Sequence, residues 1–348
     1  MYSMENLSLE PIKSFAVLRK IGVIAITWLI LISCLHYFLN AEKNKKNVVR
    51  MGYMPVITNL SAPLLDYASK NKDTKFEALK FSSFAEMGEA FRAHKIDVAF
   101  IIAPLAIVLR QQGVPLKVVY IGNRHESTLV VSSNESISSI ADLRGKTVAV
   151  PMRYSCHNLL LLKLAEEYHL RNSGFRIVEM QPPDMASALS ARSLDGYFVG
   201  EPFAAQTIKN GKSKVLFYVE QKWPNFICNV MIVHDCFISK KPAVVQKLVS
   251  GAIRAGLWAS EHTNDAAQIV SRYWNQDTDL VKFALNTPPN RINFKAYKPR
   301  KDEFAEIAKL MVRFGLMDKC TIIDSLIDPS FCDRTQTDKE ISLKDIIP

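Results

Sequence analysis

The chain has 348 residues, a formal net charge of +10 at pH 7 and 48% hydrophobic residues. This length suits two lobes with additional segments better than one small core. A positive charge balance suits nucleic acid, an anionic membrane surface or an anionic ligand. However, no Lys/Arg cluster is interleaved with aromatic residues, and no zinc-finger, helix-turn-helix or RNA-binding signature occurs. We therefore expect no nucleic-acid partner.

Residues 1–41 are expected to form a signal peptide or a membrane anchor. No charged residue occurs from Ile21 to Ala41, which is long enough to cross a bilayer. Leu31-Ile32-Ser33-Cys34 resembles the lipobox of bacterial lipoproteins, whereas the apolar residues that continue to Leu39 are typical of an uncleaved anchor. Cys34 is thus either a lipidation site or an ordinary membrane residue. In both cases the residues after the polar linker 42–47 are expected outside the cytoplasmic membrane and tethered to it.

Strands and helices alternate from Val48 onward, a pattern that predicts parallel α/β sheets. The expected strands are 48–53, 76–81, 97–102, 117–121, 128–132, 146–150, 175–179, 195–199, 214–219 and 229–234. The expected helices are 60–70, 84–94, 105–112, 158–169, 184–192, 202–209, 243–261, 264–274, 277–285 and 300–314. Residues 333–348 have no periodicity and are expected to be a loosely ordered polar tail.

The stretch 146–169 predicts a buried strand, a short polar loop and a helix start. Such a junction offers unpaired backbone N–H groups and the positive end of the helix dipole to small anions. The loop adds Arg153, Tyr154, Ser155 and His157. The alternative is a capped helix start, with Ser155 as N-cap and His157 on the surface.

The cysteines predict neither a metal site nor a catalytic centre. No pair has CxxC or metal-ligand spacing. Cys320 and Cys332 are the nearest plausible disulfide pair, although scattered small apolar residues are the favoured interpretation. Cys156 beside His157 suggests a nucleophile, but no second His or acidic partner is visible in the sequence. We expect no catalytic residue, no metal and no cofactor.

Several motifs together carry a family resemblance. The segment 142–150 resembles the strand that opens the second lobe of type II periplasmic solute-binding proteins. Further motifs resemble ligand loops of the nitrate/bicarbonate/sulfonate/taurine-binding family of ABC importers. They are Gly52-Tyr-Met-Pro55 with Ala62-Pro63-Leu64, His157-Asn158-Leu-Leu-Leu161, Gln181-Pro-Pro-Asp-Met185 with Ala188-Leu189, and Gly200-Glu201-Pro202-Phe203. They occur in the family's order over roughly Val48 to Leu316.

The resemblance implies an α/β, two-lobed type II periplasmic-binding-protein fold, each lobe a mostly parallel sheet flanked by helices. Lobe 1 would comprise 48–131 and 230–332, and lobe 2 would comprise 132–229, with crossovers at 128–132 and near Asn229. The implied protein is a monomer that captures a small solute by hinge closure. It would deliver the solute to a membrane permease driven by an ATPase. No Walker motif occurs, so the ATPase would be a separate chain.

The implied ligand is a small anion of the nitrate, sulfonate or taurine kind. Members that bind nitrate or bicarbonate often carry Trp where Phe84 stands, and a Trp-x-Asn-His-Pro-like run where this chain has Trp223-Pro224-Asn225-Phe226-Ile227. Sulfonates, other organic anions and a thiamine-precursor-like heterocycle therefore remain open. The alternatives to an import protein are a thiamine-pyrimidine biosynthetic enzyme on the same fold and a membrane-tethered sensor domain. We expect no enzyme, because the chain lacks a cysteine-rich iron motif.

Ten side chains are candidates for contact with the ligand. Tyr53, Phe84 and Phe203 have a core role as the alternative, and Glu201 has a structural or hinge role as its alternative. The full set is Tyr53, Pro55, Asn59, Phe84, Thr128, Tyr154, Ser155, His157, Glu201 and Phe203.

Overall fold

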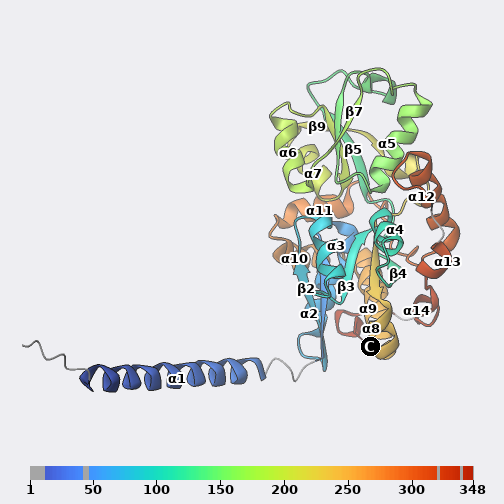
Figure 1. The fold of residues 1–348 in the computed structure, drawn as a ribbon. Coiled ribbons are helices and arrows are strands. Elements are labelled where there is room, and N and C mark those ends of the chain that lie inside the picture. The colour runs from blue at the N-terminus through green and yellow to red at the C-terminus, as the bar shows by residue number, and fades with distance from the viewer. Residues whose placement is uncertain (1–11, 42–46, 320–321, 338–339, 348) are drawn as a thin grey trace, which may run out of the picture. The chain divides into compact units, whose positions relative to one another are not determined.

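A computed structural model describes residues 12–41, 47–319, 322–337 and 340–347 (Figure 1). Contacts divide the chain into two units, Met1–Asn47 and Val48–Pro348. The first unit contains helix α1 (Ile12–Ala41), whose stretch Arg19–Tyr37 is long and apolar enough to cross a membrane. A signal sequence has the same properties. Apolar side chains of this stretch, including Trp28 and Leu29, are exposed within the unit.

The second unit contains two five-stranded sheets. The first has the order β2-β1-β3-β10-β4, and the second has the order β7-β6-β8-β5-β9. The first sheet comprises β1 (Asn47–Tyr53), β2 (Thr74–Lys80), β3 (Val98–Ile102), β4 (Leu116–Ile121) and β10 (Asn229–His234). The second comprises β5 (Ser127–Ser132), β6 (Thr147–Val150), β7 (Arg176–Glu179), β8 (Gly196–Gly200) and β9 (Ser213–Tyr218).

Each sheet contains one strand that runs against its neighbours. β10 is antiparallel to β3 and β4, and β5 is antiparallel to β8 and β9. Both strands are buried along their whole length, as expected for continuous apolar runs paired on both sides. The structure is thus a pair of mixed sheets flanked by helices.

The pairing of β5 corrects one expected lobe boundary. Residues 128–131 were expected in lobe 1 and at the crossover, but β5 is hydrogen-bonded within the second sheet. The periodicity of a strand does not specify its partners, so the sequence pattern could not assign this strand to a sheet. The chain passes between the sheets at 122–126, between β4 and β5, and at 219–228, between β9 and β10. These two crossovers pair with each other through an antiparallel bridge between Arg124 and Ile227.

Helices cover both faces of the second sheet, with α5 (Cys156–Glu167) on one side and α6 (Pro182–Ser190) and α7 (Phe203–Lys209) on the other (Figure 1). Polar side chains cap two of the helix starts that matter for the site: Ser83 accepts from Glu86 N, and Ser155 accepts from Asn158 N. Helices α9 (Pro242–Glu261), α10 (Thr263–Trp274) and α11 (Thr278–Asn286) pack against the first sheet in one apolar cluster. The helices of the second unit are α2 (Ser61–Ser69), α3 (Phe84–Arg92), α4 (Ala103–Gln111), α5 (Cys156–Glu167), α6 (Pro182–Ser190), α7 (Phe203–Lys209), α8 (Asp235–Lys240), α9 (Pro242–Glu261), α10 (Thr263–Trp274), α11 (Thr278–Asn286), α12 (Lys301–Arg313), α13 (Ile323–Leu326) and α14 (Ser330–Asp333).

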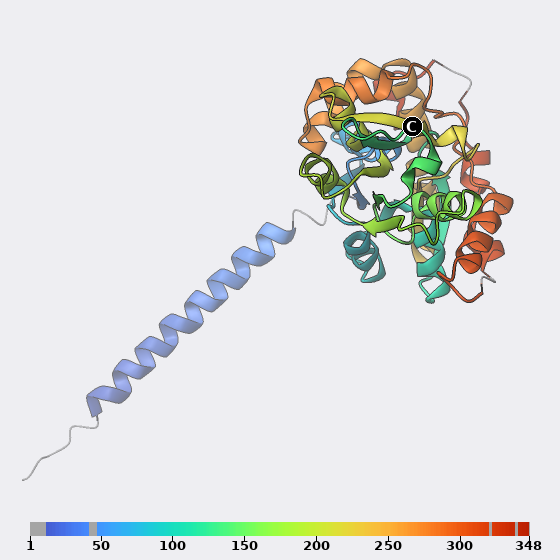
Figure 2. The same ribbon diagram turned by 90° about the horizontal axis from the view of Figure 1, so that it is seen from above.

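Helix α12 packs onto lobe 1, as expected of the C-terminal helices, and also onto lobe 2, which was not expected. It contacts α4 in the first lobe and α5 in the second (Figures 1 and 2). Its buried residues Phe304 and Met311 belong to the same apolar cluster as Phe84 and Leu160. The two lobes therefore share an apolar core at this side of the molecule.

The C-terminal segment also differs from the expected loosely ordered tail. Ile341, Ile346 and Ile347 are buried in the apolar cluster that contains α9. Arg254 of α9 donates to the carbonyl of Asp345 at 3.0 Å. The segment contains a short 3-10 helix, Leu343–Asp345, and the three isoleucines that anchor it do not recur at a helical or strand period.

Candidate functional site

The carboxyl ends of strands from both sheets meet between the lobes. The loop after β1 contains a short 3-10 helix, Ile57–Asn59, and Ile57 N donates to the carbonyl of Glu201 at the end of β8 at 2.8 Å. From the first crossover, Asn123 Nδ2 donates to the carbonyl of Ile57 at 3.0 Å. Val56 of the same loop packs into the apolar cluster of the second sheet. This junction is where open α/β sheets place ligands.

The candidates at the end of β1 and on the loop after it make contacts within the first lobe. Tyr53 is buried, its hydroxyl donates to the carbonyl of Tyr273 at 3.3 Å, and burial raises its pKa. Asn59 Nδ2 donates to the carbonyl of Met54 at 3.0 Å, while its Oδ1 accepts from Asn229 Nδ2 at 2.8 Å. Pro55 is buried beside them. Tyr53 and Asn59 thus have internal partners, and Asn59 fixes the loop to β10.

Phe84 lines a pocket of about 350 Å³ between the lobes. The first residues of α3 form one wall, and the ends of β6 and β7 with the start of α6 form the other. Two carboxylates, Glu179 and Asp184, stand at this pocket. Its lining residues are Ser83, Phe84, Ala85, Pro151, Met152, Glu179, Met180, Gln181 and Asp184.

The loop before α5 is built by hydrogen bonds of its own. Ser155 caps the helix by accepting from Asn158 N at 3.1 Å, and its hydroxyl donates to the carbonyl of Met152 at 2.7 Å. Tyr154 is half-buried, with the Arg153 guanidinium 5.7 Å from its ring centre, and it lines a second pocket of about 480 Å³. Phe203, at the start of α7, is buried among apolar side chains of the second lobe.

His157 is buried rather than on the surface. Only 1% of its surface is exposed, and its ring lies edge-on to Phe198 and Phe226 at 4.8 and 5.3 Å. Nε2 lies 2.9 Å from the Ser127 hydroxyl. Burial lowers the pKa of His157 to about 3, so the ring is neutral at physiological pH. Its contribution to a site is therefore one hydrogen-bond donor or acceptor and no charge.

Glu201 has internal partners on both carboxylate oxygens. Oε1 accepts from the Thr128 hydroxyl at 2.8 Å, and Oε2 accepts from Ala205 N in the first turn of α7 at 2.8 Å. Its pKa is raised by burial, against the nearby charge of Arg291. Both Glu201 and Thr128 thus act in positioning α7 against β5.

Sequence reasoning missed Arg291, which follows α11. Its side chain is only 4% exposed and pairs with Glu220 at 3.0 Å between Nε and Oε1. It donates to the carbonyl of Ser127 and stacks on the Tyr218 ring at 4.3 Å. Nη1 lies 3.9 Å from Glu201 Oε1. No spacing signal links position 291 to the junction, because its contacts are 71 to 164 residues away in the chain.

Several buried polar atoms at the junction have no hydrogen-bond partner in the part of the chain that the structure describes. Buried polar atoms are normally paired, so such atoms suggest a bound molecule or water. They come from the loop after β1, the first crossover, α5 and the segment after α11. The atoms are Thr58 Oγ1, Asn123 Oδ1, His125 Nε2, His157 Nδ1 and Arg291 Nη1.

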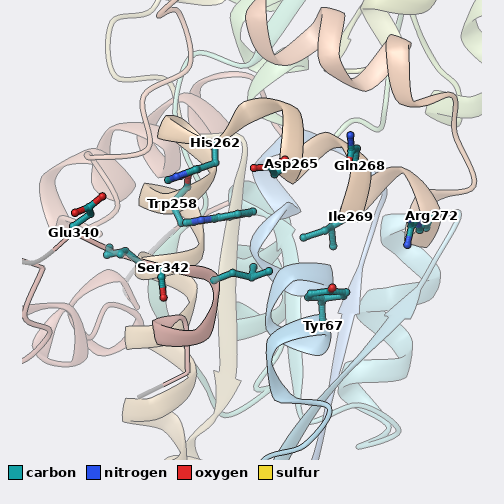
Figure 3. A pocket seen from close by; sticks show the side chains of 11 residues that line it. Tyr67, Trp258, His262, Asp265, Gln268, Ile269, Arg272, Glu340 and Ser342 are labelled. Atoms are coloured by element: carbon teal, nitrogen blue, oxygen red, sulfur yellow. The ribbon is translucent and has the colours of Figure 1, made fainter.

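A larger pocket, of about 610 Å³, lies away from the strand ends (Figure 3). It is formed by α2, the end of α9, α10 and the C-terminal segment, and it contains none of the ten predicted residues. The Trp258 and His262 rings stack beside it at 5.2 Å. Its lining residues are Tyr67, Trp258, His262, Asp265, Gln268, Ile269, Arg272, Glu340, Ile341, Ser342 and Leu343.

Within the described ranges, no group of three or more His, Cys, Asp or Glu side chains is arranged to hold a metal ion. Cys34 is exposed on α1, and Cys156, Cys228 and Cys332 are buried as free thiols. The Cys332 thiol lies 3.2 Å from the carbonyl of Val119. Cys320, its expected disulfide partner, lies outside the described residues.

Residues 42–272 match the NMT1-like family. This match covers more than half of the sequence. The chain belongs to the NMT1-like family.

Two relatives are named as binding proteins, one for taurine and one, as putative, for aliphatic sulfonates. The chain is 30% identical to the taurine-binding periplasmic protein of Escherichia coli K12 over 51% of this chain and 55% of that protein. It thus spans about half the length of this relative. A putative aliphatic sulfonates-binding protein of Bacillus subtilis 168 is 23% identical over 81% of this chain and 85% of its own length.

A solved structure shares the fold. The periplasmic nitrate-binding protein NrtA of Synechocystis PCC 6803 superposes with a TM-score of 0.76 at 15% identity, covering 87% of this chain and 91% of that protein. At this identity the likeness is one of fold. The two-lobed periplasmic-binding-protein fold implied by the sequence motifs is therefore confirmed.

Proposed function

We propose that this chain is the extracytoplasmic substrate-binding component of an ABC importer and holds a small anion between its two lobes. Membership of the NMT1-like family and the similarity to taurine- and sulfonates-binding proteins support this function. A membrane permease and a separate ATPase chain would complete the importer. The protein would act as a monomer, with one ligand between the lobes.

The observation that carries the proposal is the group of buried polar atoms without a hydrogen bond at the junction. Arg291 Nη1, which lies 3.9 Å from Glu201 Oε1, and Thr58 Oγ1 can both donate, and neither has a hydrogen-bond partner among the described residues. An oxyanion has several acceptor oxygens and would satisfy such donors. Because these atoms are buried, each charge-assisted hydrogen bond would be stronger than at the surface.

The 350 Å³ pocket beside Phe84 places a second requirement on the ligand. Glu179 and Asp184 give it negative charge, which complements an ammonium group rather than an anion. A ligand with a sulfonate at one end and an ammonium at the other would satisfy both regions. A ligand panel should therefore compare taurine, an aminosulfonate, with ethanesulfonate and nitrate.

Helix α1 would tether the lobes to the outer face of the cytoplasmic membrane. Its length and apolar composition support this role, and they suit an uncleaved anchor as well as a signal sequence. Cys34 would carry the lipid if the signal is cleaved before it. Mass spectrometry of the membrane fraction separates the two forms: an acylated N-terminal Cys34 supports cleavage, and an intact Met1 supports the anchor.

The protein would bind without catalysing a reaction. Cys156, the one nucleophile suggested by the sequence, is buried, and burial raises the pKa of its thiol. A thiol in such surroundings is poorly reactive. The buried carboxyls of Glu126 and Glu201 have protein partners, as expected of a structural network.

Thermal unfolding of the full chain in detergent, with and without each member of the panel, tests the proposed function. A ligand at a hundredfold excess over its Kd should stabilise the folded protein by about 2.7 kcal/mol. For lobes of this size the melting temperature should rise by about 2–4 °C per kcal/mol. The proposal fails if no small anion or zwitterion of the panel raises the melting temperature at any concentration.

A further inference from the structure

Three buried side chains form a hydrogen-bond chain at the lobe junction. The Ser127 hydroxyl donates to Glu126 Oε1 at 3.1 Å and lies 2.9 Å from His157 Nε2. A hydroxyl has a single proton. Because Ser127 gives that proton to the carboxylate, Nε2 must carry the imidazole proton and donate it to Ser127. His157 Nδ1 is then left with a lone pair.

Nδ1 is the end of this chain, and it has no partner in the described ranges of the sequence. The side chain is 1% exposed, so water does not reach it freely. A buried nitrogen without a hydrogen bond costs about 1–3 kcal/mol. A ligand atom that pairs with Nδ1 when the site is loaded would remove this cost.

Glu126, at the other end, lies in a tightly built environment. Oε2 accepts from Glu201 N at 2.7 Å. A Cβ at position 200 would lie 2.6 Å from the same carboxylate, so Gly200 leaves the room that Glu126 occupies. The titratable and charged groups that face it are the Cys228 thiol, the Glu201 carboxyl and the Arg291 guanidinium.

Glu126 and His157, the two ends of the hydrogen-bond chain, titrate in different pH ranges. Burial, reinforced by the charge of Glu201, raises the pKa of Glu126 to about 7. His157 has a pKa lowered to about 3 by burial and stays neutral above pH 4. Of the two groups, only Glu126 therefore changes its charge across the physiological pH range.

Protonation of Glu126 reverses the direction in which each hydrogen bond between Glu126, Ser127 and His157 is donated. A carboxyl that carries a proton on Oε1 donates to Ser127, and Ser127 then donates to His157 Nε2. His157 exchanges its Nε2 proton for one on Nδ1, so the chain gains one proton in total and the imidazole remains neutral. Nδ1 changes from a hydrogen-bond acceptor to a donor.

We propose that Glu126, acting through Ser127, sets the hydrogen-bonding character of His157 and makes the capture of an oxyanion depend on the uptake of one proton. A sulfonate or nitrate group only accepts hydrogen bonds, so it requires the N–H form of Nδ1. A ligand that presents a donor would select the reverse arrangement. Glu126 is thus a positioning residue for ligand specificity. This inference rests on the proposed function, because it takes the ligand to be an oxyanion between the lobes.

The first test needs no ligand. In the full chain in detergent, labelled with ¹⁵N-histidine, long-range ¹H–¹⁵N spectra report which nitrogen of His157 carries the proton. We expect the Nε2–H form above pH 8 and the Nδ1–H form below pH 6, with a neutral ring throughout. A single tautomer across this range overturns the proposal.

In the Glu126→Gln protein, the three hydrogen-bonded side chains should keep the arrangement that protonated Glu126 produces, whatever the pH. Glu201 N needs an acceptor, so the amide oxygen of the new side chain faces it and the amide NH₂ faces Ser127. We expect His157 to remain in the Nδ1–H form at every pH. Ser127→Ala keeps the carboxyl and removes the connecting hydroxyl, so the tautomer should no longer follow the protonation of Glu126.

The second test uses ethanesulfonate and nitrate, which do not titrate between pH 5.5 and 8.5. Titration calorimetry in two buffers of different ionisation enthalpy should show uptake of up to one proton on binding. The affinity should be constant below pH 6 and fall by up to about tenfold per pH unit above 7. The Glu126→Gln protein should bind equally well at all pH values, while Glu135→Gln, a change at a surface salt bridge with Lys146, should keep the parental profile.

A parental affinity that does not vary with pH, or a Glu126→Gln affinity that does, contradicts the proposal. Absence of binding at every pH instead contradicts the proposed function. In that case the tautomer measurement still decides whether Glu126 controls His157.

Discussion

Gly122, in the first crossover, lies in close contact with the backbone of the loop after β1. A Cβ at this position would lie 1.8 Å from the carbonyl oxygen of Thr58. Because the obstacle is backbone, Gly122→Ala should lower the free energy of unfolding by about 2–4 kcal/mol. Unfolding by denaturant measures this change in the free energy of unfolding. Gly88→Ala in α3 is the control, since its Cβ would meet only side chains at 3.7 Å or more and helix propensity favours Ala. Equal stability of the two variants would contradict the crowding at position 122.

Glu126 should make stability depend on pH in a way that Glu126→Gln removes. Its pKa is raised from 4.5 to about 7, so the folded state binds the proton more tightly than the unfolded state. This contribution is complete below pH 4.5 and is lost as the pH rises to 7, which amounts to about 3 kcal/mol. The variant should therefore gain stability relative to the parent between these pH values. A difference between the two proteins that stays constant from pH 4.5 to 7.5 would show that the carboxyl is not buried as described.

For single residues, the sequence predicted which residues lie near the lobe junction better than it predicted what each of them does there. His157 could be singled out because it follows a strand-to-helix loop. Its contact with Ser127 joins residues 30 apart, and the Arg291 contact with Ser127 joins residues 164 apart. Local spacing contains no information about such pairs. Tyr53 and Phe203, for which core and ligand roles were both open, are buried in apolar clusters.

Most helices and strands could be located from the sequence, since apolar periodicity records which face is buried. β10 spans Asn229–His234, the range expected from its apolar run. The pattern failed where burial is not periodic. The segment after residue 333 was expected to be loose, although Ile341, Ile346 and Ile347 anchor it.

This anchoring predicts that the C-terminal segment stabilises the second unit. Ile346 is fully buried beside α9, and its carbonyl would lie 3.1 Å from a Cβ at Gly251. Ile346→Ala should lower the free energy of unfolding by about 2–5 kcal/mol. Lys344→Ala, at an exposed neighbouring position, should change it by less than about 0.5 kcal/mol. Chemical denaturation of the two variants provides the comparison, and a neutral Ile346→Ala would mean that the tail is loose after all.

For the whole molecule, the two-lobed fold followed from ordered motifs, whereas the sharing of a core between the lobes did not. Helix α12 was assigned to the first lobe by its position in the chain, but its apolar face contacts both lobes. Amphipathic periodicity shows that a helix packs against something and does not identify the partner. A hinge motion of the lobes, as proposed for ligand capture, would therefore have to slide or carry α12.

The division at Asn47 predicts that residues 48–348 form a soluble protein without α1. Val48 onward contains both sheets and their apolar clusters, whereas the exposed apolar side chains of α1 belong to the first unit. Expression without residues 1–47 should move the protein from the membrane fraction to the soluble fraction with an unchanged melting temperature. A truncated protein that aggregates or unfolds would show that α1 stabilises the lobes.

Titration calorimetry of the full chain with taurine, ethanesulfonate and nitrate at pH 6 tests the central claim most directly. The account predicts saturable binding of at least one of them with a stoichiometry of one. His157→Ala should weaken that binding by about 0.5–1.5 kcal/mol, the contribution of a neutral hydrogen bond, plus any packing that is lost. Glu135→Gln should bind like the parent. Binding of the same ligand with equal affinity by the His157→Ala protein and the parent would contradict a site at the lobe junction.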